Sequence, residues 1–340
     1  MKQFWTSLRP MFVALGLALL IGAALMLISA SNPLEAYAAI IAGSFGPTGW
    51  STTLAAAIPI VGCALAVSIP LRAGLINLGG EGQLVAGGIA AVLVATALPD
   101  MPAPLALIFA VTAAAIVGAL VGLLPAIMET RLGIPLLISS LLLSYPLVAL
   151  ASFLVRFPLL DQGTGLPQTP AMPEAYRMPT LGAVTGAVFI MVAVIAVAVI
   201  VDRAMPAGFE IRLTGKNRNF TQYTGVAIDR LTHRVMAAGG ASAGLVGALI
   251  VTAFPFRFID GALIAPGFVW TGLLAAMLAR GNPIGVVIAA VFFTALEVGG
   301  AAMERETLVP RELSSILQAT VIILLAGALA LRARKNQKVA

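Results

Sequence analysis

Long apolar segments without a charged residue recur along the chain. They include the stretches 10–34, 36–71, 101–128, 132–155, 178–201 and 235–256. Each is at least as long as the about 20 mostly apolar residues that a helix needs to cross a bilayer. The pattern therefore predicts an all-α polytopic membrane protein. It excludes a free cytoplasmic enzyme, a nucleic-acid binder and a secreted domain built on disulfides.

Ten spans fit this pattern, and we expect them to form a single transmembrane domain over residues 1–340. Basic residues are enriched on the cytoplasmic side of membrane proteins. With both termini inside, cytoplasmic segments hold 15 basic residues and external segments hold 5, so the sequence predicts an N-in, C-in bundle. The expected spans are 10–30, 52–71, 81–98, 104–127, 134–155, 180–201, 235–254, 261–279, 283–302 and 314–331.

The first span has an alternative interpretation as a cleaved signal peptide. Lys2 and Arg9 form a basic start, and small residues follow the apolar run at 29–31. The apolar run is about 20 residues long, whereas a signal peptide usually has 7–15. The length favours a retained helix.

Composition agrees with a membrane protein. The chain is 60% hydrophobic and only 10% charged, with a mean hydropathy of +1.03, whereas soluble chains carry about 25% charged residues. The net charge of +6 is expected on cytoplasmic loops that face anionic lipid headgroups. Cys63 is the one cysteine and His233 the one histidine, so we expect neither a disulfide nor a metal site.

Catalytic motifs are weak or missing. Gly215-Lys216 is followed by Asn217 and lacks the upstream glycine of a phosphate-binding loop. The chain therefore cannot hydrolyse ATP with such a loop. Residues 240–244 match Gly-x-Ser-x-Gly, but that motif needs a strand-to-helix elbow, and here it opens a transmembrane helix. We therefore expect a protein that is not an enzyme and has no cofactor.

Small residues and loop composition indicate how the spans are joined. Gly118/Gly122 and Gly240/Gly244 have the spacing that allows helices to cross closely. The external segment 156–179 is rich in proline and glycine, which favours an ordered loop of turns. The internal segment 202–234 is expected to form a short helix on the membrane surface from Phe220 onward.

The segment 71–83 places polar residues between two apolar spans. It carries Arg72, Asn77, Glu81 and Gln83 among four glycines. An intramembrane charge costs at least about 2.5–3.5 kcal/mol at the bilayer centre, so it needs a partner or water. Arg72 and Glu81 could pair if the glycines fold the chain back. Both an interfacial turn and a lining or gating role fit this pattern.

The segment 208–230 interleaves charged and apolar residues. The apolar ones are Phe209, Ile211, Leu213, Phe220, Tyr223, Val226 and Ile228. A solvated loop does not need them, whereas a short helix that docks on a cytosolic partner does.

Both segments resemble the branched permease family of ABC importers for simple sugars and nucleosides. The first matches at Arg72, Gly74, Asn77, Gly79, Glu81, Gly82 and Gln83. The glutamine after Glu81-Gly82 resembles the nucleoside-type permeases in particular. The second matches at Arg212, Gly215, Asn217, Tyr223 and Gly225. A third patch, 267–285, resembles a late family segment that ends in Asn282-Pro283-Ile284-Gly285.

The resemblance implies roles for named residues. Those expected to couple the chain to an ATPase are Glu210, Arg212, Gly215, Asn217, Tyr223, Gly225 and Asp229. Those expected to line or gate the pathway are Arg72, Asn77, Glu81, Gln83, Phe254 and Trp270, although residues such as Phe254 and Trp270 more often pack or anchor a helix at the interface. The chain departs from the family at Arg218, Phe220, Thr221 and Thr224, where proline and alanines are usual.

The resemblance also implies partners and a location. A cytosolic ATPase, a second and non-identical permease and an external solute-binding protein are expected, in a bacterial inner membrane. The expected solute is a nucleoside or base, with a simple sugar as the alternative. An ion-coupled secondary transporter is disfavoured, because only Glu297 sits clearly inside a span. An intramembrane enzyme would need a nucleophile and base that the sequence does not show.

Overall fold

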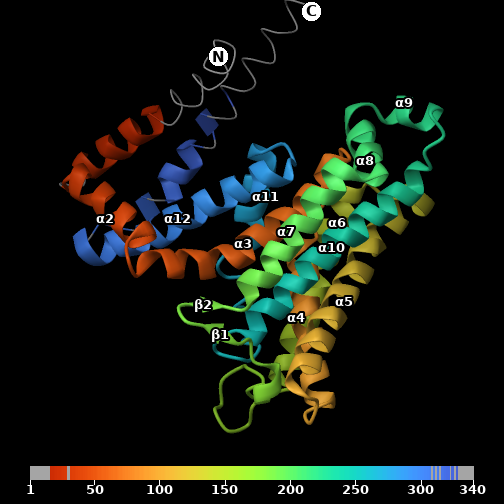
Figure 1. Cartoon of the computed structure of the whole chain (residues 1–340), viewed down its shortest axis with the longest axis horizontal. Coiled ribbons are helices and arrows are strands. Elements are labelled where there is room, and N and C mark those ends of the chain that lie inside the picture. Colours follow the sequence, from red (N-terminus) through yellow and green to blue (C-terminus); the bar gives the residue numbers. More distant parts are fainter. Residues whose placement is uncertain are drawn as a thin grey trace, which may run out of the picture. The chain divides into compact units, whose positions relative to one another are not determined.

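The computed structural model describes residues 16–28, 31–307, 309–310, 312–313, 315–321, 323–324 and 327. The predicted first and last spans, 10–30 and 314–331, lie partly outside these residues. The described chain is mostly helical (Figure 1). Its helices are α2 Pro33–Phe45, α3 Gly49–Arg72, α4 Gly80–Ala97, α5 Ala103–Leu132, α6 Leu136–Arg156, α7 Ala187–Ala204, α8 Pro206–Lys216, α9 Arg218–Tyr223, α10 Ile228–Thr252, α11 Phe268–Leu278 and α12 Pro283–Thr307.

Seven of the described helices are long and apolar enough to cross a membrane. Gly16–Ile28 and α2 pass the same test only as a strongly bent pair, which gives up to eight. The prediction of a mostly helical, polytopic membrane protein is confirmed, whereas the predicted ten spans and the N-in, C-in topology are not. The seven helices are α3, α4, α5, α6, α7, α10 and α12.

The predicted span 261–279 is wrong as a full-length helix. The chain turns through residues 260–266, and α11 has only 11 residues. Gly261 and Gly267 adopt left-handed backbone angles, with φ of +76° and +70°, and Pro266 removes a backbone donor between them. These residues interrupt the helix, because a left-handed residue cannot continue it.

Other boundaries also differ from the prediction. The span expected at 180–201 begins only at Ala187, because 180–185 form a hairpin in which Thr180 pairs with Thr185 and Leu181 with Val184. The helix α10 starts at Ile228, seven residues before the apolar run. The helix α2 was not predicted, although the sequence carries two signals for its start. The Asn32 side chain caps the helix by accepting a hydrogen bond from the Leu34 amide, and Pro33 occupies the first helical position.

The described residues form two compact units. The first contains those up to Ala56 and those from Val291 onward. Within it, α2 lies against α12, where Gly43 faces Ala302 so closely that a Cβ on Gly43 would clash. The Ser44 hydroxyl donates to the Ala295 carbonyl, and Thr53 Oγ1 donates to the Ser44 carbonyl at 2.9 Å.

The second unit, residues 57–290, is built on a close crossing of α5 and α10. A Cβ on Gly118 would clash with the Gly240 carbonyl, and one on Gly122 would lie 2.5 Å from the Met236 carbonyl. The two predicted glycine motifs therefore pack against each other, as expected for helices in close van der Waals contact. A similar approach of Gly87 to Gly244 brings α4 onto α10.

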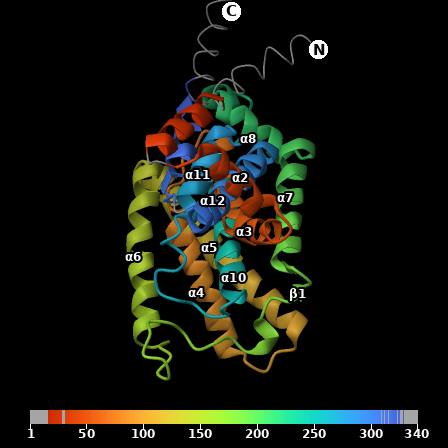
Figure 2. The ribbon, with the colours of Figure 1, turned by 90° about the vertical axis from the view of Figure 1, so that its left-hand side faces the viewer.

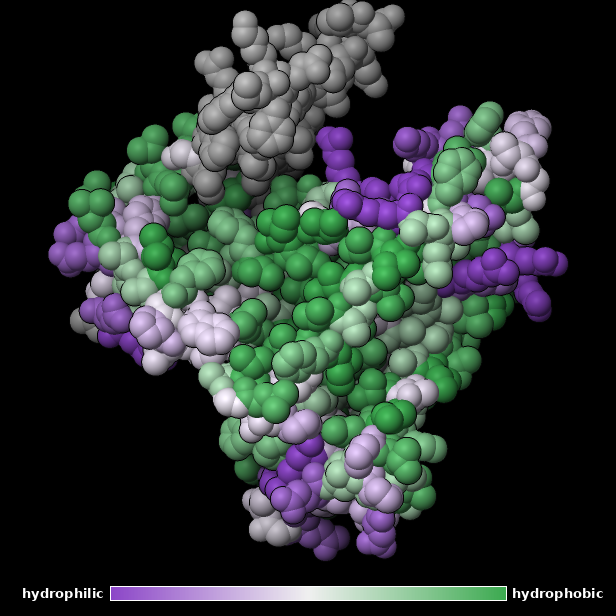
Figure 3. Space-filling model, viewed as in Figure 1, coloured by the Kyte–Doolittle hydropathy of each residue, from purple (hydrophilic) through white to green (hydrophobic). Residues whose placement is uncertain are grey.

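The helices α6 and α7 lie on opposite flanks of this glycine-packed core (Figure 2). They are far less buried than α10. In the most apolar 18 residues of each helix, 72% are buried for α10 but only 17% for α7. On the face of the second unit seen in Figure 3, apolar side chains cover the middle of the unit, and hydrophilic side chains gather at its two ends. The second unit thus has a dense centre and lightly packed flanks.

Candidate functional site

Three segments that are distant in sequence meet at Arg72, the last residue of α3. A Cβ on Gly215, near the end of α8, would clash with the Arg72 carbonyl oxygen. A Cβ on Gly281, which follows α11 and has a φ of +70°, would lie 3.2 Å from the Arg72 amide nitrogen. Close backbone approach explains why these positions hold glycine. The segments that carry the family resemblance therefore come together at one point.

The Arg72 side chain forms an ion cluster there with Asp202 and Arg212. Arg72 Nε and Nη2 donate to the two Asp202 oxygens at 3.1 and 3.3 Å, and Arg212 Nη1 lies 3.5 Å from Asp202 Oδ1. The Asp202 side chain is 11% exposed. Charge-assisted bidentate bonds are among the stronger polar contacts in proteins. One carboxylate thus joins the ends of α3 and α7 to α8.

This cluster corrects the sequence prediction in two ways. Arg72 does not pair with Glu81, because Asp202 takes the guanidinium. Asp202 itself was assigned to a charged loop and was not singled out. The sequence does carry a signal for this role. Asp202 follows directly on the apolar run of α7, and a carboxylate at such a position needs a basic partner.

The predicted coupling segment is two short helices rather than one. The second helix, α9, begins at Arg218, two residues before the expected start, because Asn217 caps it by accepting from the Phe220 amide at 3.0 Å. Gly225 follows α9 with a φ of +90°, which suits glycine. Asp229 lies exposed in the first turn of α10, and Glu210 is half-buried on α8.

Aromatic side chains project from these two helices. Phe209, Phe220 and Tyr223 are 59%, 55% and 91% exposed. Arg218, which replaces the usual proline, lies 3.8 Å from Glu129 of α5. Exposed aromatics on short helices are typical of an interface with another protein. The α8–α9 segment thus presents an apolar surface while ion pairs hold it to α5 and α7.

The segment between α3 and α4 is unwound and internally satisfied. The side chains of Asn77 and Gln83, both 1% exposed, exchange two hydrogen bonds at 3.1 and 3.3 Å. Ser140 and Ser144 of α6 accept from the Leu78 and Gly82 amides at 3.1 and 3.3 Å. Non-helical backbone is tolerated at membrane depth where protein satisfies it. Asn77 and Gln83 therefore hold the break in place.

Glu81 and Trp270 meet beside this break, whereas Phe254 does not join them. Trp270 Nε1 donates to Glu81 Oε1 at 2.8 Å. Phe254 is 85% exposed, and its ring meets Phe256 edge to face with centroids 6.1 Å apart. It lies where α10 ends, away from Arg72. The pathway candidates therefore separate into three places.

An apolar cavity of about 550 Å³ lies next to the ion cluster, between α3, α7 and α10. Leu65, Val194, Val197 and Leu245 are among its lining residues, and Arg72, Asp202 and Arg234 are its charged ones. The cavity leaves space between α7 and the glycine-packed core of the second unit.

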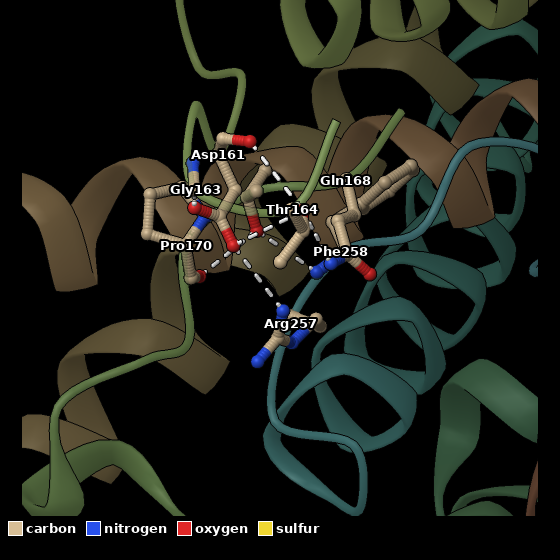
Figure 4. A network of polar contacts seen from close by, with 8 residues as sticks. Asp161, Gly163, Thr164, Gln168, Pro170, Arg257 and Phe258 are labelled. Atoms are coloured by element: carbon tan, nitrogen blue, oxygen red, sulfur yellow. Dashed lines mark hydrogen bonds and ion pairs between the residues drawn. The ribbon is translucent and has the colours of Figure 1, made fainter. Parts of the chain in front are cut away.

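The opposite end of the second unit carries the ordered loop that was predicted for 156–179. Asp161 binds Arg257 at 3.4 Å (Figure 4). The Thr169 amide donates to the Phe258 carbonyl at 2.9 Å, and the Phe258 amide donates to the Thr169 hydroxyl at 3.1 Å. Arg156 Nη2 lies 2.7 Å from Asp260 Oδ2. Buried Tyr176 donates to the Leu98 carbonyl at 2.6 Å, and burial raises the pKa of its hydroxyl.

The two ends also differ in basic residues. We name them the Arg72 end and the Asp260 end. The Asp260 end carries Arg156, Arg177 and Arg257. The Arg72 end carries three times as many, namely Arg72, Arg131, Arg203, Arg212, Lys216, Arg218, Arg230, Arg234 and Arg280.

Comparison with known proteins agrees with this arrangement. Residues 49–326 match the family profile described as branched-chain amino acid transport system / permease component. The guanosine ABC transporter permease protein NupP of Bacillus subtilis (strain 168) is 31% identical over 94% of this chain and 93% of its own length.

Two further relatives match over similar lengths. The glucose ABC transporter permease protein TsgB13 of Haloferax volcanii is 32% identical over 91% of this chain and 84% of its own. The nucleoside ABC transporter permease protein NupB of Lactococcus lactis subsp. cremoris is 26% identical over 92% of this chain and 89% of its own length. Such subunits are multi-pass inner membrane proteins that transport rather than catalyse, and their family implies ATPase and solute-binding partners. The chain belongs to the family of branched-chain amino acid transport system permease components and is an ABC transporter permease.

Proposed function

We propose that this chain is the permease subunit of an ABC importer for nucleosides or related bases. Two of the three relatives are named for guanosine or nucleoside transport. The glucose relative makes a simple sugar the second candidate. The observation that carries the coupling role is the convergence of α3, α7 and α8 on Asp202.

In this proposal α8 and α9 are the contact with the ATPase. Phe209, Phe220 and Tyr223 dock on the partner, and Glu210, Arg212, Gly215, Asn217, Gly225 and Asp229 set the shape and charge of the segment. When the ATPase closes, α8 moves. Because Asp202 ties α8 to the ends of α3 and α7, these spans shift with it as a rigid body.

The helix α7 is the span best placed to move. It is the least buried of the seven candidate spans, and the cavity of about 550 Å³ lies beside it. The helix α10 is held by glycine contacts on α4 and α5 and serves as the fixed element. Access to the solute would then alternate as α7 tilts against this core.

The orientation follows from the charge difference between the ends. Nine basic residues at the Arg72 end and three at the Asp260 end favour a cytoplasmic Arg72 end. The external loop 156–179 then faces the solute-binding protein. A second, non-identical permease subunit completes the transporter.

Reconstitution tests the proposal directly. The chain is co-expressed with the genes for its ATPase, second permease and binding protein, purified and assayed for ATP hydrolysis with guanosine, other nucleosides and glucose. We expect nucleosides to stimulate hydrolysis more than sugars. Stimulation by glucose alone would assign a sugar importer instead. Uptake by this chain alone in vesicles without ATP would contradict the ABC mechanism.

A cysteine label tests the orientation. The variant Cys63→Ala removes the buried native thiol, and Tyr223→Cys adds one on exposed α9. We expect a membrane-impermeant maleimide to label this position only in inside-out vesicles. Labelling from the external side would contradict the coupling role of α8 and α9. Gly163→Cys, in the opposite loop, is the matched control and should show the reverse pattern.

A further inference from the structure

We infer that Glu81 and Trp270 form the solute contact of the permease. The Glu81 carboxylate accepts hydrogen bonds from the hydroxyl groups of a ribose or sugar, and the Trp270 ring stacks on the solute. The inference rests on the proposed function and names the residues that would recognise the solute. It is carried by the charge, depth and exposure of this pair.

The pair lies well inside the membrane-spanning part of the second unit. A Cβ on Gly272, two residues after Trp270, would lie 2.7 Å from the Ala64 amide nitrogen. Ala64 is eight residues from the Arg72 end of α3, which is about 12 Å at 1.5 Å per residue. On the other side, a Cβ on Gly80 would lie 2.6 Å from the Val269 side chain. Glu81 and Trp270 therefore sit where α4 and α11 both begin.

Glu81 has no cationic partner at this depth. Within the described part of the chain, its one polar contact is the Trp270 indole at 2.8 Å, and no ion pair within 4.0 Å involves it. A carboxylate is costly inside a membrane protein unless it faces water or a ligand pathway. The half-buried Glu81 carboxylate, with one oxygen still without a donor, therefore needs a hydrogen-bond donor from outside the chain.

Nearby polar groups do not supply that donor. Asn77 and Gln83 use their amides on each other, and Ser140 and Ser144 accept from the backbone. Arg72 is held by Asp202. Glu81 is thus the acidic group of the break that remains available to a passing solute.

Trp270 adds a flat apolar surface next to this carboxylate. Trp270 is 47% exposed, and the indole nitrogen, the only polar atom of its side chain, already donates a hydrogen bond to Glu81. The fixed indole can stack on a base or on the apolar face of a sugar, while the carboxylate accepts from hydroxyls on the same solute. Sites for small molecules combine an apolar surface with a few placed polar groups in this way.

The test compares solutes with and without ribose hydroxyls. Initial uptake of guanosine and 2′,3′-dideoxyguanosine is measured in proteoliposomes that hold the full transporter with its binding protein. For Glu81→Gln we expect guanosine uptake to fall about tenfold, the loss of one hydrogen bond to a charged group. Uptake of the dideoxy solute should change less than about twofold. The preference for guanosine would then fall with the binding protein unchanged.

Substitution of Trp270 tests the stacking half. Trp270→Leu should lower uptake of both solutes about tenfold, in line with the usual loss on removal of a base-stacking aromatic. Trp270→Phe keeps a ring but loses the indole N–H that binds Glu81, so its uptake of both solutes should lie between that of Trp270→Leu and that of the unchanged protein. Trp50→Phe and Glu35→Gln are matched controls, because Trp50 is 43% exposed and Glu35 is exposed in the first unit. Neither control should change the guanosine preference.

The outcomes separate this inference from the proposed function. Equal loss of both solutes in Glu81→Gln, no loss, or no guanosine preference in the unchanged protein would overturn the solute contact. Uptake of glucose but not guanosine by the unchanged protein would overturn the nucleoside assignment alone. The same variants would then be tested with glucose and 2-deoxyglucose, and an unchanged preference there would also overturn the contact.

Discussion

The two ends of the second unit both use Arg–Asp pairs but connect different kinds of structure. At the Arg72 end, Asp202 binds two guanidinium groups from α3 and α8 and itself ends α7. At the Asp260 end, the pairs Arg156–Asp260 and Asp161–Arg257 tie a helix end and two loops together. The first arrangement links spans to a surface helix, whereas the second holds a loop surface in shape.

Glycine packing follows the same division. At the Arg72 end, Gly215 and Gly281 press against the Arg72 backbone, so the contact leaves no space for a side chain. In the loop of the Asp260 end, Gly163 has only the Asp161 side chain within reach, at 3.4 Å. In the proposed mechanism, the same type of pair transmits movement where the backbone is tightly packed, whereas it orders a loop where the backbone has room.

Enlarging the tight glycine should have the largest effect. In Gly215→Ala the new Cβ clashes with the Arg72 carbonyl, so α8 must separate from α3. We expect uptake in the full transporter to fall at least about tenfold, while ATP hydrolysis continues and membrane insertion is normal, because about 1–3 kcal/mol is usual for overpacking. Normal uptake would show that the contact does not couple α8 to α3.

Gly163→Ala is the matched control for this change. It adds the same methyl group at the Asp260 end, where the Cβ meets an ordinary contact distance. We expect uptake within about twofold of the unchanged protein, since surface changes usually stay within about 0.5 kcal/mol. A loss as large as that of Gly215→Ala would remove the difference between the two ends.

Neutralising one aspartate at each end should have the next largest effect. Asp202→Asn leaves the Arg72 and Arg212 guanidinium groups without their shared carboxylate. We expect the number of solutes moved per ATP to fall about threefold to tenfold, because the helices α3, α7 and α8 lose a charge-assisted connection. The measurement is the ratio of uptake to ATP hydrolysis in proteoliposomes.

Asp260→Asn is the counterpart at the other end. It weakens the pair with Arg156, whose side chain is 56% exposed, so the expected loss is small. We expect a weaker dependence of uptake on the binding protein and an unchanged ratio of uptake to ATP hydrolysis. A changed ratio in Asp260→Asn but not in Asp202→Asn would reverse the assignment of the two ends.

The sequence predicts the centre of the fold better than its breaks. The apolar runs locate α3, α5 and α6 to within a few residues, because a span must be long and apolar in any arrangement. The glycine motifs of α5 and α10 also predict their crossing. The half-length α11 was missed, since an apolar composition does not reveal where Pro266 and two left-handed glycines end the helix.

The candidate site shows the same limit. The family resemblance singles out Arg72, Arg212 and Gly215, and the structure brings them together. It does not single out Asp202, because the partner that takes both carboxylate oxygens, Arg72, is 130 residues away in sequence. Pairing is decided by which helix ends meet, so Arg72 and Glu81, nine residues apart, find different partners.

The smallest effect is expected from loss of the Asp161–Arg257 pair, and it is measured as a coupling energy for comparison with the pair at the Arg72 end. Its side chains are 22% and 23% exposed, and the two atoms lie 3.4 Å apart. A double-mutant cycle of Asp161→Asn and Arg257→Gln, read by thermal unfolding of the purified protein, should give a coupling energy of about 1 kcal/mol or less. The same cycle on Asp202→Asn and Arg72→Gln should give more, because Asp202 is 11% exposed and its bonds with Arg72 are bidentate. Equal coupling energies would mean that the Arg72 end is no more firmly connected than the loop, and α8 would then lack a stiff link to the spans.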